Sequence, residues 1–198
     1  MDKKVMRNIS YGLFILTARD GDKLNGCVTN TLQQVTTSPN RISITVNKEN
    51  YTHDMVLKAG EFNVSILSED AKFDTFKHFG FQTGRDIDKF EDFPMVLAKN
   101  DIPYITDGTN GYISAKVIHS IDLGSHTLFL ADVTDGEVLS SVPSATYDYY
   151  HKNIKESPDE KSKGWVCKIC SYVHPHEDLP ADFICPLCKH PASDFEKL

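Results

Sequence analysis

Alternating apolar and polar residues mark much of the first 150 positions of the chain. The segment 41–46 (RISITV) places Ile42, Ile44 and Val46 on one face, and the segment 62–67 (FNVSIL) repeats the pattern. A period of two is typical of β-strands with one buried face. Further strands are predicted in four segments, 11–19, 27–35, 112–120 and 126–134. Turns are predicted at the Asp-Gly pairs 20–21, 107–108 and 135–136.

Two short helices interrupt the predicted strands. One is predicted to run from Thr52, a suitable N-cap residue, to Gly60. The other is predicted from Ser68, with acidic residues in its first turn, to Gly80. This many strands with so few helices favour a mainly β fold. A closed or nearly closed antiparallel barrel is expected, because closure removes exposed sheet edges.

A polar segment divides the chain. The segment 151–163 (HKNIKESPDEKSK) holds one aliphatic residue, Ile154, among charged residues, serines and a proline. This composition is typical of a linker. We therefore expect one domain over residues 1–150, a linker over 151–163 and a small domain over 164–198.

Composition and charge exclude several classes of partner. The formal net charge is −7 and no basic run occurs, which argues against nucleic acid or an anionic membrane. No apolar run approaches the roughly 20 residues of a membrane span. The apolar stretch near the N-terminus is closed by Arg19 and Asp20, with no cleavage site of a signal peptide. Because four of the five cysteines are paired in sequence, we expect a metal site in a reducing cytoplasm rather than disulfides.

The paired cysteines predict where that metal binds. Cys167 and Cys170 form one C-x-x-C pair, and Cys185 and Cys188 form a second pair after 14 intervening residues. Four thiolates complete a tetrahedral site for zinc or iron. The 35 residues from 164 to 198 are too few for a self-sufficient core, so metal ligation must supply the missing stability. Spacing alone favours zinc, because zinc ribbons are common.

The residues around the cysteines favour iron instead. Trp165 precedes the first pair, which continues as C-x-x-C-x-Tyr, while a Leu-Pro and then C-P-x-C form the second half, followed by Phe195. In these features the tail resembles rubredoxin, a one-iron Fe(Cys)₄ electron carrier, in a form with a shortened loop. The resemblance implies that all four cysteines ligate iron.

Some residues of the tail differ from that pattern or compete with it. Ser171 and Lys189 stand where rubredoxins often carry glycine, which affects the reduction potential more than the ligation. Three histidines, His174, His176 and His190, lie in the same segment. We expect them to be exposed rather than ligands, because the thiolates already complete the set.

Two polar stretches stand out in the front domain, which has neither a G-x-x-x-x-G-K-[ST] nor a G-x-G-x-x-G motif. The stretch 25–39 (NGCVTNTLQQVTTSP) is strand-like but has little to bury. The stretch 46–56 (VNKENYTHDMV) brings Lys48 and hydroxyl groups to a predicted helix start, a natural phosphate site. Taken separately, the first stretch is equally well explained as a Thr-rich edge strand, and the second as an ordinary capped helix.

Taken together and in order, these stretches are similar to the flavin reductase family. The shared pattern is N-G-x-x-x-N-T, V-x-x-x-P and V-N-K-x-x-Y-T-H, continued by the segments 79–90 (FGFQTGRDIDKF) and 124–139 (GSHTLFLADVTDGEVL). The resemblance covers nearly all of residues 5–150. It implies a split β-barrel that binds FMN at the interface of a homodimer.

The resemblance also implies roles for individual residues. Thr29, Asn30 and Thr31 would line the isoalloxazine ring, although the family commonly has serine at position 30. Gln34 would lie near the ribityl chain, where serine is frequent. The ribityl and phosphate end would be held by Asn47, Lys48, Asn50, Tyr51 and Thr52. His126 is the candidate catalytic residue near the flavin and nicotinamide; the alternative is a strand histidine that faces a partner subunit.

Other residues of the front domain receive simpler interpretations. Arg85 and Lys89 either attract a dinucleotide phosphate or are surface charges, and the second interpretation is favoured. Cys27 is expected to be a buried, inert thiol, since no basic partner is identifiable. The near-helical spacing of four phenylalanines predicts core residues, namely Phe73, Phe76, Phe79 and Phe81.

The whole arrangement resembles the flavin reductase–rubredoxin fusions of anaerobes, the high-molecular-weight rubredoxin type. The resemblance implies an oxidoreductase that passes electrons from NAD(P)H through FMN to iron. From iron, the electrons would pass to a redox acceptor protein, such as a diiron flavoprotein that reduces oxygen or nitric oxide. Flavin accepts two electrons and releases them singly, which suits a one-electron iron. Two alternatives remain: a passive relay reduced by a separate reductase, and a zinc ribbon for partner recognition on a flavin-binding barrel.

Overall fold

A computed structural model describes residues 5, 8–155, 164–168, 172–185 and 191–198. The chain divides into a barrel unit, Met1–Ile154, and a tail unit, Lys155–Leu198. The predicted ligands Cys170 and Cys188 lie outside the described residues, as do His190, Ser171, Lys189 and most of the predicted linker. Within the described parts of the chain, no helix is long and apolar enough to cross a membrane.

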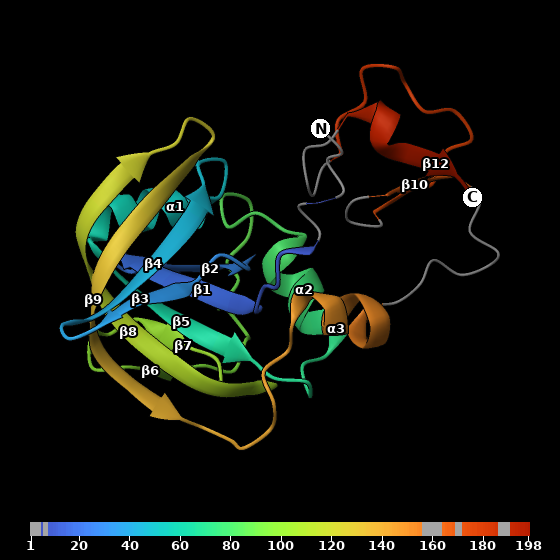
Figure 1. The fold of residues 1–198 in the computed structure, drawn as a ribbon. Helices are drawn as coiled ribbons and strands as arrows, with labels where there is room; N and C mark the ends of the chain where they lie inside the picture. Colours follow the sequence, from blue (N-terminus) through green and yellow to red (C-terminus); the bar gives the residue numbers. More distant parts are fainter. Residues whose placement is uncertain (1–4, 6–7, 156–163, 169–171, 186–190) are drawn as a thin grey trace. The chain divides into compact units, whose positions relative to one another are not determined.

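Seven antiparallel strands form the main sheet of the barrel unit (Figure 1). They are β1 Phe14–Asp20, β2 Lys23–Thr29, β3 Gln33–Thr37, β4 Asn40–Asn47, β5 Glu61–Leu67, β8 Thr109–Asp122 and β9 His126–Val138. Two short strands, β6 Val96–Leu97 and β7 Pro103–Tyr104, pair with each other. The helices are α1 Tyr51–Ala59, α2 Phe73–Gly80 and α3 Tyr147–Tyr149, the last continued by a π-helical turn, Tyr150–Ile154.

The strand order shows why this sheet is a barrel. The order is β2-β1-β5-β8-β9-β4-β3, so β2 and β3 are the two edge strands. Only residues 30–32 join these edges. A connection of this length reaches about 14 Å at most, so the sheet has to curl until its edges approach each other. The curled sheet is visible in Figure 1. The prediction of a mainly β, split-barrel fold is confirmed.

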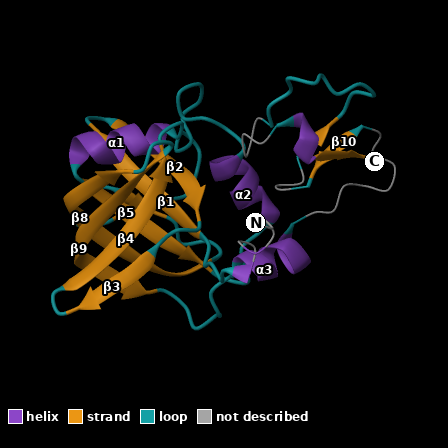
Figure 2. Ribbon diagram, turned by 45° about the horizontal axis from the view of Figure 1, so that its top comes forward, coloured by secondary structure: helices purple, strands orange, loops and turns teal. Residues whose placement is uncertain are grey.

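Apolar residues of alternate strand positions fill the barrel. Ile42, Ile44 and Val46 of β4 point into this core and are almost fully buried. Helix α1 adds Met55 and Val56 to the same core. Figure 2 shows α1 lying across one end of the strands. Burying side chains of this size contributes about 1.5–3 kcal/mol each, so α1 stabilises the barrel by closing that end.

A second core lies on the outer face of β1. Ile15 and Leu13 of this segment pack with α2 and with the π-helical turn, where the Phe76 and Tyr150 rings are 4.4 Å apart. Among the four predicted core phenylalanines, Phe76 and Phe79 are buried and Phe73 packs against this core. Phe81 is 41% exposed, so the prediction is wrong for this residue.

The tail unit has its own small sheet and core. Its strands are β10 Trp165–Cys167, β11 Val173–His174 and β12 Phe195–Lys197, in the order β11-β10-β12, and Ala192–Asp194 forms a 3-10 turn. Cys167, Cys185 and Phe195 are buried together. Four partly buried apolar residues surround them, Trp165, Tyr172, Leu179 and Phe183.

One strand prediction and one turn prediction need correction. The predicted strand 27–35 is broken at residues 30–32, because its two halves belong to opposite edges of the sheet. The Asp135–Gly136 pair is not a turn: it lies within β9, where Asp135 pairs with Ser114 and Gly136 with Ile113 of β8. The extended pairing of a long hairpin outweighs the local turn preference of Asp-Gly here.

The helix boundaries also differ from the predictions. The N-cap of α1 is Asn50 rather than Thr52, whose buried hydroxyl accepts a hydrogen bond from Asn25. Helix α2 begins at Phe73, after a turn in which the Ala71 amide donates to the Ser68 carbonyl. The π-helical turn extends to Ile154, into the predicted linker. It does so because Tyr150 is buried and Ile154 packs against the second core.

Candidate functional site

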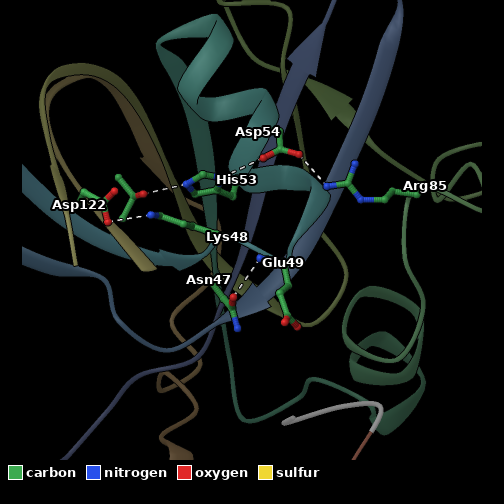
Figure 3. Close-up of polar contacts among 8 residues, drawn as sticks. Asn47, Lys48, Glu49, His53, Asp54, Arg85 and Asp122 are labelled. Carbon is green, nitrogen blue, oxygen red and sulfur yellow. Dashed lines mark hydrogen bonds and ion pairs between the residues drawn. The ribbon is translucent and has the colours of Figure 1, made fainter. Parts of the chain in front are cut away.

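The candidate site begins where β4 ends and β9 begins. Asn47 and His126 are direct partners in the pairing of these strands. Beside them, the Lys48 amide donates to the Ser125 carbonyl at 3.0 Å. The Lys48 ammonium contacts Asp122 Oδ1 at 2.7 Å (Figure 3). This contact, followed by the Gly124 amide, lowers the pKa of Asp122, which favours its ionised carboxylate.

The first turn of α1 follows directly. The carbonyl of Asn50 accepts a hydrogen bond from the His53 amide, but the Asn50 side chain does not cap the helix. Two cations lie over the Tyr51 ring: Lys23 Nζ is 4.7 Å from the ring centroid and Arg85 Cζ is 4.9 Å from it. An uncapped helix start beside basic groups suits an anion.

The connection between β2 and β3 is fixed to the same region. The Thr31 hydroxyl donates to the Thr45 carbonyl at 2.6 Å. Since a hydroxyl has one hydrogen, Thr29 is the donor in its 3.1 Å contact with Thr31. Asn30 lies between them, half-buried, and its side chain has no hydrogen-bond partner among the described residues. Its amide is therefore available to a bound molecule.

A series of polar contacts beneath this region was not predicted from the sequence. His53 is 4% exposed; its Nε2 lies 2.8 Å from the Thr127 hydroxyl and its Nδ1 lies 3.1 Å from Asp54. Asp54 also accepts from Arg85 at 2.6 Å, as Figure 3 shows. The His53 contact and then the Arg85 contact lower the pKa of Asp54. The available signal was a histidine directly beside Thr52 on the buried side of a predicted helix.

Lys89 and Cys27 form a second buried polar group. Lys89 is 3% exposed, and its Nζ donates to the carbonyls of Gly26 and Phe79 at 2.8 and 2.9 Å. The favoured interpretation of Lys89 as a surface charge is therefore wrong. Burial lowers the pKa of Lys89 to about 8. Burial also raises the pKa of the Cys27 thiol, against smaller opposing effects of Thr52 and Lys89. Cys27 thus does have a basic neighbour, but the thiol stays protonated and inert.

Of the predicted cofactor residues, Thr52 is buried within the barrel unit and Gln34 lies apart from the others. The Thr52 hydroxyl is fully buried and bonded to Asn25, so it supports the helix from within. Gln34 pairs with Ile42, five positions before Asn47 on β4, which corresponds to about 17 Å. Its side chain donates to Asn40 at the opposite end of that strand. The structure therefore brings together Thr29, Asn30, Thr31, Asn47, Lys48, Asn50, Tyr51 and His126, without Gln34.

The tail unit fits a thiolate-bound metal ion. The Cys167 amide donates to the Tyr172 carbonyl at 2.9 Å. Ile184 and Pro191 form an isolated β-bridge. Cys167 and Cys185, one from each pair, are buried in the same cluster. The prediction of three exposed histidines holds for His176, but His174 packs on the Phe183 ring at 4.5 Å.

The two units match two known families. Residues 6–158 match the flavin reductase like domain, which is most of the chain. The chain belongs to the flavin reductase-like family. Residues 165–196 match the rubredoxin-like domain of rubrerythrin, so this flavin reductase-like domain is fused to a rubredoxin-like one.

Similar proteins share one or both parts. The high molecular weight rubredoxin of Moorella thermoacetica is 34% identical over an alignment of 229 positions that covers both chains completely. The ferric-chelate reductase (NAD(P)H) of Archaeoglobus fulgidus is 36% identical over 76% of this chain and 89% of its own. The structure of an NADH:FAD oxidoreductase from Streptomyces globisporus superposes with a TM-score of 0.66 at 22% identity, covering 73% of this chain and 85% of that one.

Membership of the flavin reductase-like family confirms several predictions. The chain is an oxidoreductase, and its tail is a rubredoxin-like domain, as the cysteine spacing and its neighbours indicated. The donor set described above fits a flavin: amide and hydroxyl groups lie at residues 29–31, and an uncapped helix start with Lys48 lies nearby.

Proposed function

We propose that the protein carries electrons from NAD(P)H through a bound FMN to one iron ion in the tail, and on to an acceptor protein. The observation that carries the proposal is the fusion itself. One chain holds a flavin reductase-like barrel and a tail in which cysteines of both C-x-x-C pairs share one buried cluster. A flavin exchanges one or two electrons, whereas a thiolate-bound iron exchanges one. The barrel would thus convert a two-electron donor into one-electron steps.

The proposed flavin site uses the residues that lie together. Thr29, Asn30 and Thr31 would hydrogen-bond the ring system, and the contacts of Thr31 with Thr45 keep this loop in place. Asn47, Lys48, Asn50 and Tyr51 would hold the ribityl and phosphate end at the start of α1. A terminal phosphate favours FMN at a helix start of this kind. Gln34 and Thr52 are outside this proposed site, because one is distant and the other is buried.

His126 is the proposed catalytic residue. It is half-buried at the start of β9, opposite Asn47, and its Nδ1 lies 2.8 Å from the Ser125 hydroxyl. That contact fixes the orientation of the ring and leaves Nε2 to face a substrate. The role proposed for His126 is to orient the nicotinamide beside the flavin.

Iron is the proposed metal of the tail, held by Cys167, Cys170, Cys185 and Cys188. The buried position of Cys167 and Cys185 beside Phe195 would shield the ion from water. The tail supplies a redox-active ion only if that ion is iron, because zinc has no redox chemistry in proteins. The acceptor would be a protein that takes single electrons, such as a diiron flavoprotein.

A homodimer is the proposed assembly. The β8–β9 hairpin leaves apolar side chains exposed near its tip: Ile121 is 46% exposed and Leu123 is 54% exposed. Ile121 pairs with Leu128, which adds to the same face. Apolar patches on one face are typical of interaction surfaces. This face lies on the hairpin that also carries His126.

An anaerobic titration with NADH tests the proposed function. The oxidised protein should take up three electrons per chain, two on the flavin and one on iron. Uptake of two electrons, with zinc found in the tail, would support a partner-recognition module instead. If NADH alone does not reduce the protein, but NADH together with a cell extract does, the protein is a passive relay.

A further inference from the structure

A cavity opens at the end of the barrel away from α1. Its volume is about 610 Å³, and it is lined by the beginnings of β4 and β8, the ends of β5 and β9, and Gln34 of β3. Figure 2 shows β3 at the end of the sheet opposite α1. Asn40 at the cavity lies seven positions before Asn47 on β4, a separation of about 23 Å. The cavity is therefore separate from the candidate functional site.

Two glycines leave the inner face of the β8–β9 pair hollow at this end. Gly136 pairs with Ile113, and Gly111 pairs with Val138. Paired residues of antiparallel strands point to the same face of a sheet, so two of these four inward positions carry no side chain. Aliphatic residues that belong to or pack against the barrel core form the floor of the cavity, namely Ile42, Ile66, Ile113 and Val133.

The polar side chains of the inner rim are neutral. Gln34 pairs with Ile42 and Asn40 lies two positions before it, so both side chains share the inner face with Ile42. Gln34 Nε2 donates to Asn40 Oδ1 at 2.9 Å. The Nδ2 hydrogens of Asn40 and the second Nε2 hydrogen of Gln34 have no partner among the described residues. The rim thus presents N–H donors to the cavity without a formal charge.

The carboxylates at this edge belong to the outer face of the sheet. Glu137 pairs with Tyr112 and Asp135 pairs with Ser114, whereas the positions between them face inward. Asp135 is held on the outer face by the Tyr112 hydroxyl at 3.1 Å and by Lys99 at 3.0 Å. Nearby carboxylates disfavour an anionic ligand, and the inner face of the cavity has no carboxylate for a cationic one. A neutral ligand fits this distribution of charge best.

We propose that the cavity binds a neutral, mainly apolar molecule that carries a carbonyl group. The apolar part would lie against the aliphatic floor, and the carbonyl oxygen would accept hydrogen bonds from Asn40 and Gln34. The volume is within the range of roughly 300–1,000 Å³ that is typical of small-molecule sites. An apolar floor recessed below a polar rim suits a small molecule better than a protein segment. The inference does not depend on the proposed function, because the cavity lies at the other end of the barrel.

An NMR titration of the full-length protein with 1-tetralone, a neutral ring system with one carbonyl group, tests the site. FMN is kept in excess, so that the proposed flavin site is filled. The δ1-methyl signals of Ile42, Ile66 and Ile113 should shift, while that of Ile15, on the outer face of β1, should not. No shift up to the solubility limit, or shifts confined to the surroundings of His126, would overturn the inference.

Two further probes test the chemistry of recognition. Tetralin lacks the carbonyl group and should bind about 3- to 10-fold more weakly than 1-tetralone, the loss expected for one neutral hydrogen bond. The anion 1-naphthoate should bind more weakly still. Equal affinities for the three probes would overturn the assignment of a neutral carbonyl ligand. A protein that NADH does not reduce would leave all these results unchanged, so the proposed function fails separately.

Variants of the floor and the rim locate the ligand. Val133→Phe would fill the cavity and should weaken 1-tetralone about 10-fold or more. Val96→Phe, at an exposed position of β6 outside the lining, is the matched control and should change nothing. Asn40→Asp keeps an acceptor for Gln34 but removes the Nδ2 donors.

Asn40 is exposed at the rim, so Asn40→Asp should fold like the wild type even if Val133→Phe does not. It should weaken 1-tetralone about 3- to 10-fold and leave tetralin unchanged. Unchanged affinity for 1-tetralone in Asn40→Asp, or in a folded Val133→Phe, would overturn the inference.

Discussion

The Lys89 Nζ atom lies 2.8 Å from the carbonyl oxygen of Gly26, at a side chain that is 3% exposed. This bond joins the segment after α2 to β2, and the bond to the Phe79 carbonyl joins it to α2. The same segment carries Arg85. The buried Lys89 ammonium stabilises the position of this segment by binding backbone carbonyls. These bonds account for how the segment 81–90, which is distant in sequence, is held near the start of α1.

Replacing Lys89 should change how stability depends on pH. The folded-state pKa of about 8 lies below the usual value of 10.5, so above pH 8 the unfolded chain binds more protons and wild-type stability rises with pH. Below pH 8 both states are protonated and the slope vanishes. Relative to Lys89→Met, wild type should gain about 2 kcal/mol between pH 7 and 9.5. Urea unfolding of both proteins measures this gain, and a difference that does not vary with pH would contradict it.

Gly84→Ala should destabilise the barrel unit. A Cβ atom at Gly84 would collide with the Asn25 side chain, whose Oδ1 is buried without a hydrogen-bond partner among the described residues. Overpacking of this kind costs about 1–3 kcal/mol. Gly80→Ala is the control, since its Cβ would meet Val28 at an ordinary 3.4 Å. Equal unfolding free energies for the two variants would contradict this prediction, because they would show that the segment around Gly84 shifts without cost to make room for the Cβ atom.

Cys185→Ser should abolish metal binding and order in the tail while leaving the barrel intact. Cys185 is buried in the tail core, which is too small to persist without metal. Metal analysis and amide NMR spectra of the full-length protein report the two parts separately. Cys27→Ser, in the barrel unit, should retain the metal. Retention of a full equivalent of metal by Cys185→Ser would show that this cysteine is not a ligand.

Ile121→Asp should convert the proposed dimer into monomers. Ile121 and Leu123 are exposed on the β8–β9 hairpin, and a buried unpaired carboxylate at an interface is costly. Light scattering after size exclusion measures the mass. Val138→Asp is the control, because Val138 is 82% exposed at the opposite end of β9. A mass that Ile121→Asp does not change would place the interface elsewhere.

Local patterns predicted the parts of this protein that depend on local physics. The period of two identified β4 and β5, and cysteine spacing identified the tail, because each pattern has one dominant physical explanation. The failures involve distant partners. The run 27–35 is broken because its halves occupy opposite sheet edges, and Lys89 is buried because carbonyls 10 and 63 positions away satisfy it. The role of Gln34 near the ribityl chain stays a prediction, and the strand register places Gln34 opposite Ile42, five positions before Asn47.

Rapid mixing of the anaerobic, oxidised protein with NADH tests the central claim most directly. The proposed route predicts that flavin absorbance bleaches first and iron absorbance second, and that Cys185→Ser retains only the first phase. Bleaching of the flavin with an iron signal that stays oxidised, while dithionite reduces both centres, would contradict transfer of electrons from the barrel to the tail.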